Sequence, residues 1–485
     1  MENTSEIGED LTLQKEEFKK RAKAIVEIPA HFKPVIEDIL EDENGGGEAI
    51  FTWVNEAQEE EEIDLALDLN GHLLRLSIDK NYEEPMINPL NEGEKQRIGE
   101  SFLGHHYPDA LKSLTLSKVI NQTYDDIFYY EQLVMDLPLP NAGCTIVIDH
   151  GGDVIGFTYQ GIKPIPHIPE TVIAKEKLVA DVQARLDFEL NIVQQEEGDF
   201  RLVYEPTLEC SDYKAERLEP TLTIIHEAED VYRRFIPLPI PANSPQNPSA
   251  SNEEIIGITE EMEVIREKDM GDEWGVVWRN KNWEGNEKEL SLNAFLANHN
   301  DDTVKAFINK ETGKVTRFIW FHERTGDLQL TREECFAIAS DFLQKMIPEY
   351  CPYLQLVVSR ESDEDLDQPT TMSGFMFWFH NGQGIPVQSE IVMVVVNPTT
   401  GQIDHYSGVH MELEHLQQTE AEPAISKEEA RKQFLKHLDF QLSWDYDYEN
   451  ESHTLIYESC DCHTRTHIRY IDAMTGEVIT YQDLF

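Results

Sequence analysis

The side chains best suited to chemistry lie near the C-terminus, in the segment YESCDCHTRTHIRY. It contains Cys460, Cys462, His463 and His467. In an extended strand the two cysteines share one face, because side chains alternate between the two sides of a sheet. Thiolate and imidazole groups are ligands for zinc and copper. These four residues are therefore the candidate metal ligands of the chain.

The spacing of the two cysteines argues against a metal. Zinc knuckles separate their cysteines by two or more residues, whereas one residue separates Cys460 from Cys462, and no second pair of ligands accompanies them. Unpaired cysteines also serve as small apolar residues in protein cores. We therefore expect both cysteines to face the core, the two histidines to be solvated, and the protein to carry no metal or other cofactor.

Sequence signatures of the common enzyme classes are absent from the chain. It contains no GxSxG elbow, no HExxH, no GxxxxGK(S/T), and no GxGxxG between a strand and a helix. This absence favours a non-enzymatic protein, with a hydrolase or metal-dependent enzyme of unrecognised type as the alternative.

A second candidate site is aromatic. In the strand-like run GFMFWFH, three phenylalanines point to one side while Trp378 points to the other. One helix packed on this strand cannot cover aromatic side chains on both of its faces. The remaining surface is either covered by a neighbouring unit or offered to a partner. The candidate partner-binding residues are Phe375, Phe377, Trp378 and Phe379.

The charge of the chain limits the partners that it attracts. Its 93 acidic and 40 basic residues give a formal net charge of -53 at pH 7. Such a surface repels phosphate backbones and anionic lipids, which argues against nucleic acid and membranes. A protein or a basic peptide is the partner that this charge favours, although adaptation to a saline environment would explain the acidity without any partner.

The distribution of apolar residues and cysteines predicts a cytoplasmic protein. The first residues are acidic and lack the apolar run of a secretory signal. Elsewhere the longest aliphatic stretch, IVMVVV, falls far short of the roughly 20 residues that cross a bilayer. The six cysteines are scattered along the chain, which suits a reducing compartment.

Two segments of the chain are repeated, which predicts a tandem duplication. The stretch Ile173 to Leu190 matches Ile425 to Leu442, and both contain Leu-Asp-Phe near their ends. Likewise, Asn91 to Leu116 matches Thr331 to Leu356. Between the copies lies a segment rich in Pro, Ser and Asn. The predicted division is a first half at 1–235, a linker at 236–254 and a second half at 255–485.

Each half contains a smaller repeated unit. Tight turns such as NKETGKV, NPTTGQI and DAMTGEV join two strand-like runs, with Gly supplying a positive φ and the leading Asn or Asp bonding to the turn backbone. A helix with a capping box, led by Thr331 and Glu334, precedes such strands. We therefore predict an α+β fold made of tandemly duplicated helix-on-antiparallel-sheet units, three in each half. Their approximate ranges are 14–80, 91–165, 170–234, 255–320, 331–410 and 425–485.

The capped helix, the strand ending in NGQGIPV and the closing (N/D)xxTGx(V/I) turn resemble the YcdB/YcdC repeat family of Bacillus-type bacteria. The units of that family are similar to PepSY domains. The resemblance is strongest from about Leu292 to the C-terminus. It implies the helix-on-sheet fold and, by analogy with PepSY segments of protease propeptides, a regulatory or inhibitory contact with another protein. It implies no catalytic residues.

Overall fold

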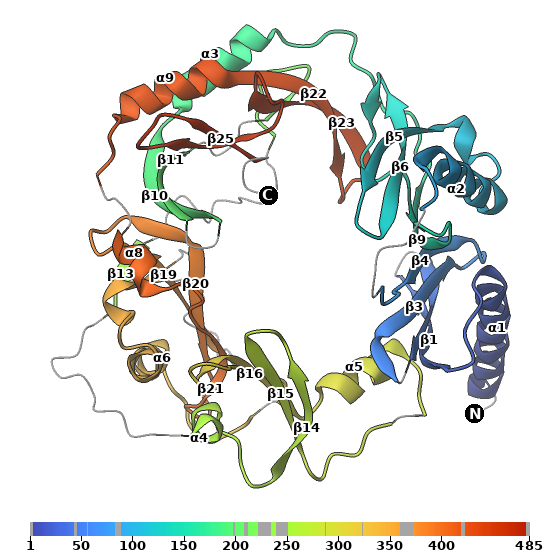
Figure 1. Cartoon of the computed structure of the whole chain (residues 1–485), viewed down its shortest axis with the longest axis horizontal. Coiled ribbons are helices and arrows are strands. Elements are labelled where there is room, and N and C mark those ends of the chain that lie inside the picture. The colour runs from blue at the N-terminus through green and yellow to red at the C-terminus, as the bar shows by residue number, and fades with distance from the viewer. Residues whose placement is uncertain are drawn as a thin grey trace. The chain divides into compact units, whose positions relative to one another are not determined.

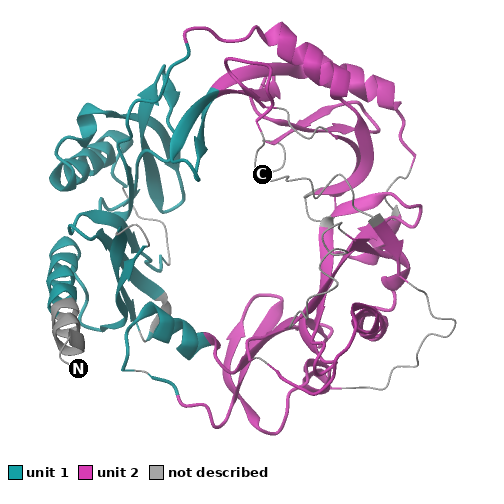
Figure 2. Cartoon of the chain, turned by 180° about the vertical axis from the view of Figure 1, so that it is seen from behind, with its two compact units in different colours: residues 1–169, 285–299, 443–455 teal, residues 170–284, 300–442, 456–485 magenta. Residues whose placement is uncertain are grey.

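A computed structural model describes the chain in twelve stretches, and these fall into two compact units (Figure 2). Unit 1 comprises residues 1–169, 285–299 and 443–455, and unit 2 comprises 170–284, 300–442 and 456–485. The described stretches are 3–42, 46–55, 57–82, 89–196, 199–207, 212–221, 234–238, 251–286, 288–322, 324–358, 372–418 and 422–481.

Unit 1 is built on an antiparallel sheet, with the strand order β1-β2-β3-β4-β9-β8-β6-β5 and the short β7 paired to β6 (Figure 1). Its elements are α1 (Asn3–Ile25), β1 (Phe32–Glu41), β2 (Gly47–Asn55), β3 (Gln58–Asp68), β4 (Leu73–Ile78), α2 (Glu92–His106), η1 (Ala110–Lys112), β5 (Leu114–Asn121), β6 (Asp125–Val134), β7 (Leu137–Pro138), β8 (Gly143–Asp149), β9 (Val154–Gly161) and α5 (Leu292–Asn300).

The core of unit 1 lies between this sheet and its two long helices. Phe18 of α1 and Leu103 of α2 join one cluster with the buried residues Phe51, Trp53 and Phe157 of the sheet. In β2 these large side chains alternate with residues on the opposite face, as expected for a strand covered on one side. Burying such side chains is the main stabilising contribution to a unit of this kind.

Unit 2 is built on a larger sheet whose main path runs β14-β15-β16-β17-β21-β20-β10-β11-β24-β25, with β19, β18 and β13 branching from β20. Its elements are α3 (Lys175–Arg185), β10 (Phe188–Glu196), β11 (Asp199–Pro206), β12 (Tyr213–Lys214), β13 (Arg234–Pro237), α4 (Asn252–Ile256), β14 (Met262–Asp269), β15 (Glu273–Asn280), β16 (Thr303–Asn309), β17 (Val315–Trp320), α6 (Arg332–Met346), η4 (Cys351–Tyr353), β18 (Leu354–Val358), β19 (Ser373–His380), β20 (Pro386–Val396), β21 (Ile403–Ser407), α8 (Leu413–Gln418), α9 (Lys427–His437), β24 (Ile468–Asp472) and β25 (Val478–Thr480).

Two further strands, β22 (Leu438–Asp447) and β23 (Ser452–Asp461), form a smaller sheet with β12, in the order β12-β23-β22. Nearly all strand pairs of unit 2 are antiparallel, the exception among those described being β10 beside β20. The predicted fold class is confirmed, because each unit combines helices with antiparallel sheet. Within the described residues, no helix has the length and hydropathy of a membrane-spanning segment.

The predicted turn chemistry is confirmed at the repeated turns. Asn397 Oδ1 accepts the backbone N–H of Thr399 at 2.9 Å, and Asp472 Oδ1 accepts that of Met474 at 2.8 Å. The following glycines, Gly401 and Gly476, have φ values of 71° and 79°. In this left-handed region glycine avoids the steric cost of a Cβ. The sequence pattern therefore fixes these turns locally.

Helix capping follows the predicted pattern in the second half. Thr331 and Glu334 form a complete capping box at the start of α6, and Ser426 accepts the backbone N–H of Glu429 at the start of α9. By contrast, α3 begins after Ala174, which provides no side-chain cap. The helix of the earlier copy therefore lacks the stabilising cap of its later counterpart.

Of the predicted linker at 236–254, residues 239–250 lie outside the described residues. On one side of this gap, β13 pairs with β18, and on the other side α4 begins at Asn252. The strands of the predicted third repeat, β10 and β11, belong to unit 2, where they pair with β20 and β24. The boundaries of the compact units therefore differ from those of the two sequence halves. We propose that the two halves, 1–235 and 255–485, are the two copies of the duplicated sequence.

Candidate functional site

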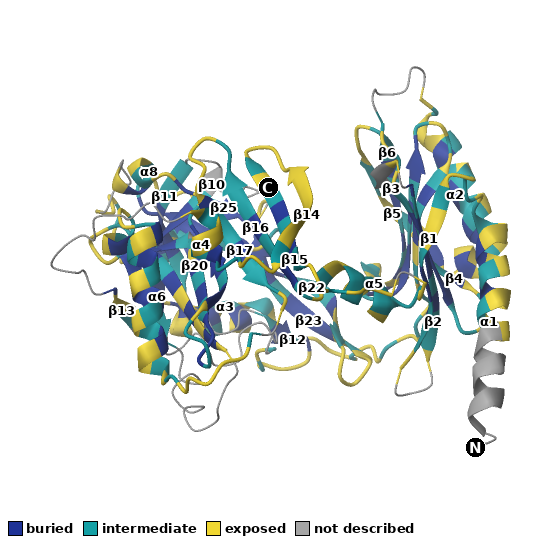
Figure 3. Cartoon of the chain, turned by 90° about the horizontal axis from the view of Figure 1, so that it is seen from below, coloured by how far each residue is buried: buried dark blue, intermediate teal, exposed yellow. Residues whose placement is uncertain are grey.

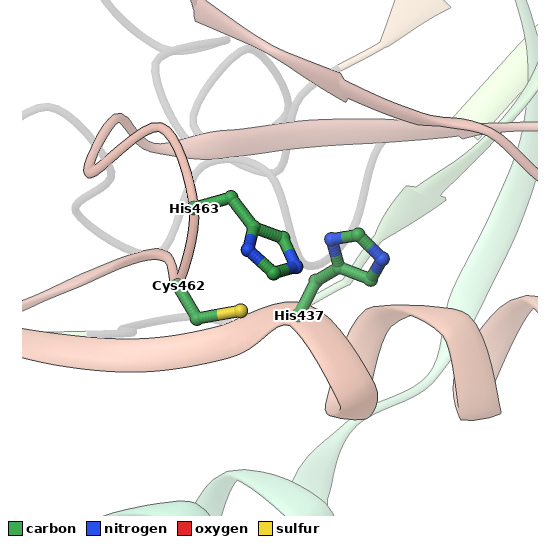
Figure 4. Close-up of side chains that lie close together, drawn as sticks. All are labelled: His437, Cys462 and His463. Atoms are coloured by element: carbon green, nitrogen blue, oxygen red, sulfur yellow. The ribbon is translucent and has the colours of Figure 1, made fainter.

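His437, Cys462 and His463 form a cluster in unit 2 (Figure 4). One ligand atom from each side chain, a ring nitrogen or the sulfur, lies within 4.8 Å of the others. His437 is the last residue of α9, whereas Cys462 and His463 begin the turn that follows β23. A helix end and a turn therefore supply the three side chains.

Backbone contacts fix the helix end against the turn. The backbone N–H of Cys462 donates to the carbonyl oxygen of His437 at 2.7 Å. The rings of His437 and His463 lie edge to face, with 5.3 Å between their centroids. The turn itself is closed by a bond from the N–H of Asp461 to the carbonyl oxygen of Thr466 at 2.8 Å. The cluster is therefore anchored by main-chain geometry.

Asp461 orients two residues of the cluster, His437 and His463, through hydrogen bonds. Its Oδ1 lies 2.8 Å from Nδ1 of His437, and its Oδ2 accepts the backbone N–H groups of His463 and Thr464 at 2.8 and 2.7 Å. Burial opposes ionisation of this carboxyl, but the hydrogen bonds from Thr464 and His437 outweigh it and lower its pKa to about 2. The carboxylate holds the Nδ1 side of His437, which is the side of the ring that faces His463 in Figure 4.

The structure separates the four predicted ligands. Cys462 and His463 belong to the cluster, whereas Cys460 is buried, and its pKa is raised by that burial. His467 lies apart, with its Nδ1 3.4 Å from the carbonyl oxygen of Ser459. The expectation that both cysteines face the core is wrong for Cys462, which is only partly buried. The reason is that β23 ends at Asp461, so strand alternation no longer governs the next residue.

His437 was missed in the sequence because nothing in the spacing links it to the cysteines. It lies in the preceding helix, and the β22–β23 hairpin brings the turn back to the end of that helix. The only sequence signal is that a histidine closes the helix just before the Leu-Asp-Phe repeat. A thiol and two imidazoles at one point offer a ligand set for a borderline-soft divalent metal ion.

Three of the four aromatic candidates lie in the core of unit 2. Phe375, Phe377 and Phe379 are 2%, 0% and 0% exposed. The ring of Phe336 in α6 lies 5.6 Å from that of Phe375 and 6.3 Å from that of Phe377. The ring of Tyr350, just after α6, lies 6.0 Å from that of Phe379, so this helix and the residues just after it contact all three phenylalanines. Trp378 is the candidate left on the opposite side of the strand, which this helix does not cover.

The opposite side of β19 and β20 presents apolar side chains. Trp378 pairs across the strands with Ile391, and Met376 pairs with Met393. The ring of Phe235 in β13 lies 5.8 Å from that of Trp378. Met376 and Ile391 are 40% and 41% exposed. These five residues, Phe235, Met376, Trp378, Ile391 and Met393, are called the apolar outer face below.

A hollow of about 560 Å³ lies in unit 1, beside the end of α1 and the start of β1. Its lining combines apolar side chains such as Phe32 and Trp53 with Lys19 and Lys23. The ammonium of Lys19 lies 2.6 Å from Oε1 of Glu37, so that one of the two basic groups is already neutralised. None of the residues singled out in the sequence contributes to this hollow.

Comparison with known proteins identifies two kinds of domain. A family model described as "YcdB, YcdC repeated domain" matches residues 15–161 and again 247–410. A second model, "Peptidase propeptide and YPEB domain", matches residues 424–481. Two matches to one model confirm the predicted internal duplication, and the second model covers the region that contains the His437, Cys462 and His463 cluster.

The relatives of the chain are similar over nearly its whole length. It is 28% identical to "Uncharacterized protein YcdC" of Bacillus subtilis (strain 168) over 438 residues, covering 89% of this chain and 92% of the relative. To "Uncharacterized protein YcdB" of the same organism it is 28% identical over 482 residues, covering 96% and 98%. Among solved structures, it matches the Bacillus megaterium YpeB C-terminal domain at 12% identity and a TM-score of 0.26, covering 62% of this chain and 95% of that chain.

Proposed function

The chain belongs to the YcdB/YcdC repeat family, and on this premise we propose that it is a non-enzymatic protein that binds a segment of another protein. The match of its C-terminal region to a peptidase propeptide domain supports, by analogy, a regulatory or inhibitory contact with another protein. The alternative is a metal-dependent enzyme or hydrolase, which the thiol and imidazole cluster keeps open.

The apolar outer face is the observation that carries this proposal. Met376 and Ile391 expose about two fifths of their surface in the middle of strands, beside Trp378. Aromatic residues and methionine are enriched in the cores of protein interfaces, whereas charged residues are depleted there. In a chain with 93 acidic residues, a face on which the paired strands β19 and β20 present apolar side chains is suited to contact with a partner.

The charge of the chain selects the kind of partner. A net charge of -53 attracts basic segments over the surrounding surface and repels acidic ones. We therefore propose an extended segment that places apolar side chains on the apolar outer face and Lys or Arg side chains around it. The same charge argues against nucleic acid and lipid headgroups as partners.

The proposed location is the cytoplasm. Among the described cysteines, Cys144, Cys335, Cys351 and Cys460 are buried thiols. Burial raises the pKa of Cys144 to about 12 and that of Cys351 to about 11, which keeps both thiols protonated and unreactive. The described cysteines are free thiols scattered along the chain, which suits a reducing compartment.

Peptide titration tests the binding proposal. The full chain is titrated with two extended peptides that share one apolar pattern, one carrying Lys and Arg and the other Asp and Glu. We expect the basic peptide to bind and its affinity to fall as salt rises, because salt screens the attraction. Met376→Ser combined with Ile391→Ser is expected to weaken binding about tenfold, as removal of interface anchors does.

Val264→Ser provides the matched control for these variants. Val264 is 52% exposed on β14, an edge strand apart from the apolar outer face, so its replacement also removes an exposed apolar side chain. This variant should bind the basic peptide as the unmodified protein does. Equal affinity for both peptides, no affinity for either, or the same loss in the control would refute peptide capture and leave the metal-dependent enzyme as the better proposal.

A further inference from the structure

We propose that His437, Cys462 and His463 bind a zinc ion, with a fourth coordination position left open. The proposal rests on the side chains of the cluster and is independent of peptide binding. Zinc takes nitrogen ligands from histidine and sulfur ligands from cysteine, in tetrahedral sites. Three protein ligands with one open position is the arrangement in which water or a partner's donor atom completes the coordination.

The three side chains are close to the geometry that zinc requires. Bond lengths of about 2.0 to 2.3 Å place tetrahedral ligands about 3.3 to 3.8 Å apart. The ligand atoms of this cluster already lie within 4.8 Å of one another. The remaining gap of about 1 Å is closed by side-chain rotation, since His463 is exposed and Cys462 is only partly buried.

Asp461 holds two of the three proposed ligands in place through hydrogen bonds. Here Nδ1 of His437 lies 2.8 Å from Oδ1 of Asp461, whose carboxylate is buried. The same carboxylate accepts the backbone N–H of His463 at 2.8 Å. One buried group therefore positions two of the three proposed ligands.

The local charge favours a cation at this point. His437 ends α9, and the C-terminal end of a helix carries partial negative charge. Arg465, the arginine of the same turn, forms an ion pair with Asp439, which reduces its repulsion of a metal ion. Asp439 also lies 3.1 Å from the ammonium of Lys175, so the two basic groups share this one carboxylate.

Zinc binding would connect two elements of the propeptide-like region. The ion would join the end of α9 to the turn after β23 through side chains, in addition to the backbone bond between Cys462 and His437. Because the metal binds the folded arrangement, it should raise the thermal stability of the protein as its concentration exceeds the dissociation constant. Measuring the melting temperature with and without zinc is therefore a second test of the site.

Competition with a chromophoric chelator measures the affinity. The full chain is stripped of metal, kept reduced with a phosphine, and titrated with zinc in excess Mg²⁺, which occupies the many carboxylates. We expect about one equivalent of tightly bound zinc. Cys462→Ser and His463→Gln should each weaken binding at least about tenfold, because each change removes one of the three proposed ligands.

His467→Gln is the matched control, because it removes a histidine of the same segment that lies outside the cluster. This variant should bind zinc as the unmodified protein does. Cobalt substitution identifies the ligand directly, since thiolate bound to Co²⁺ absorbs in the near ultraviolet. That absorption should appear in the unmodified protein and in His467→Gln, and should be absent from Cys462→Ser. Circular dichroism establishes whether each variant is folded. If Cys462→Ser does not fold, His463→Gln provides the test, because His463 is exposed.

Three results would overturn the proposal. The first is zinc binding that Mg²⁺ abolishes, which would place the ion on surface carboxylates. The second is cobalt binding without thiolate absorption. The third is an equal loss of affinity in His467→Gln and His463→Gln. Peptide binding by the apolar outer face is measured separately, so failure of either proposal leaves the other standing.

Discussion

Units 1 and 2 cover one face of an antiparallel sheet with helices but differ on the opposite face. In unit 1 the opposite face includes a row of polar residues, because Thr52, Asp64 and Ser77 lie in register across β2, β3 and β4. The hydroxyl of Thr52 donates to the carboxylate of Asp64 within that face. In unit 2 the equivalent side of β19 and β20 carries Met376 and Ile391. Figure 3 colours each residue by its burial and shows buried residues along the strands of both units.

The difference shows which part of the repeat is shared and which part is free to change. Helix-covered faces need large apolar side chains in both units, since the core is made there. The other face does not form the core, so its residues are free to differ. In unit 1 Thr52 and Asp64 form a hydrogen bond there, whereas in unit 2 Met376 and Ile391 are exposed there. The peptide-binding proposal therefore concerns the face without helices, and the largest stability effects are expected on the helix-covered face.

The largest expected effect tests whether the helix-covered faces are equivalent. Phe51 in unit 1 and Phe377 in unit 2 are both 0% exposed. Replacing either by Ala should cost about 3–5 kcal/mol, since each change leaves a cavity in a packed core. Hydrogen exchange measures the loss in the unit that carries the change. Met376→Ala, next to Phe377 on the other side of β19, should cost under about 1 kcal/mol; equal costs for the two neighbours would reverse the assignment of faces.

A smaller effect is expected at two glycines in tight turns, Gly152 between β8 and β9 and Gly313 in the repeated turn NKETGKV. Gly152 and Gly313 have φ values of 97° and 66°, so alanine at either position costs about 1–2 kcal/mol of backbone strain. At Gly152 an added Cβ would also lie 2.7 Å from Cδ1 of Leu90, whereas at Gly313 it would meet open space. Gly152→Ala should therefore lower the melting temperature more than Gly313→Ala. Gly104→Ala in α2 is the control, since its Cβ meets nothing and alanine favours helix; a loss there as large as at Gly152 would contradict the explanation.

The smallest effect concerns the polar face of unit 1. A hydrogen bond with Asp64, partial burial, and the charges of Asp64 and Asp79 raise the pKa of Glu62 to about 8, from a usual 4.5. A raised pKa means that the folded state holds this proton more tightly than the unfolded state. The resulting stabilisation is complete below about pH 4.5 and is lost as the pH rises through about 8.

Glu62→Gln should therefore reduce the dependence of stability on pH between about 5 and 8, and should stabilise the protein above about pH 8. The effect is small because solvent reaches Glu62 and screens the charges. Melting temperatures measured across this range check it. Glu41→Gln, an exposed change on the same sheet, is the control. If both variants shift stability equally at every pH, the coupling between Glu62 and Asp64 is refuted.

Local features of the fold could be predicted from the sequence. The turns at Asn397 and Asp472 form because an Asn or Asp side chain bonds to N–H groups two and three residues later. The cap at Thr331 spans three residues and the alternation in β19 follows from its pleat. All of these interactions join residues that are close in the chain, so the sequence specifies them without knowledge of the rest of the fold.

Only the tertiary structure decided which distant segments meet. It placed β10 beside β20, and it brought His437 against Cys462 and His463, while it left Cys460 in the core. These outcomes depend on where β23 ends and on how the β22–β23 hairpin returns to α9. Strand pairing is chosen among many partners of similar pattern, and the choice follows from the packing of the whole unit. The sequence alone therefore determined the repeat and its turns, whereas the proposed zinc site and the apolar outer face depend on long-range packing.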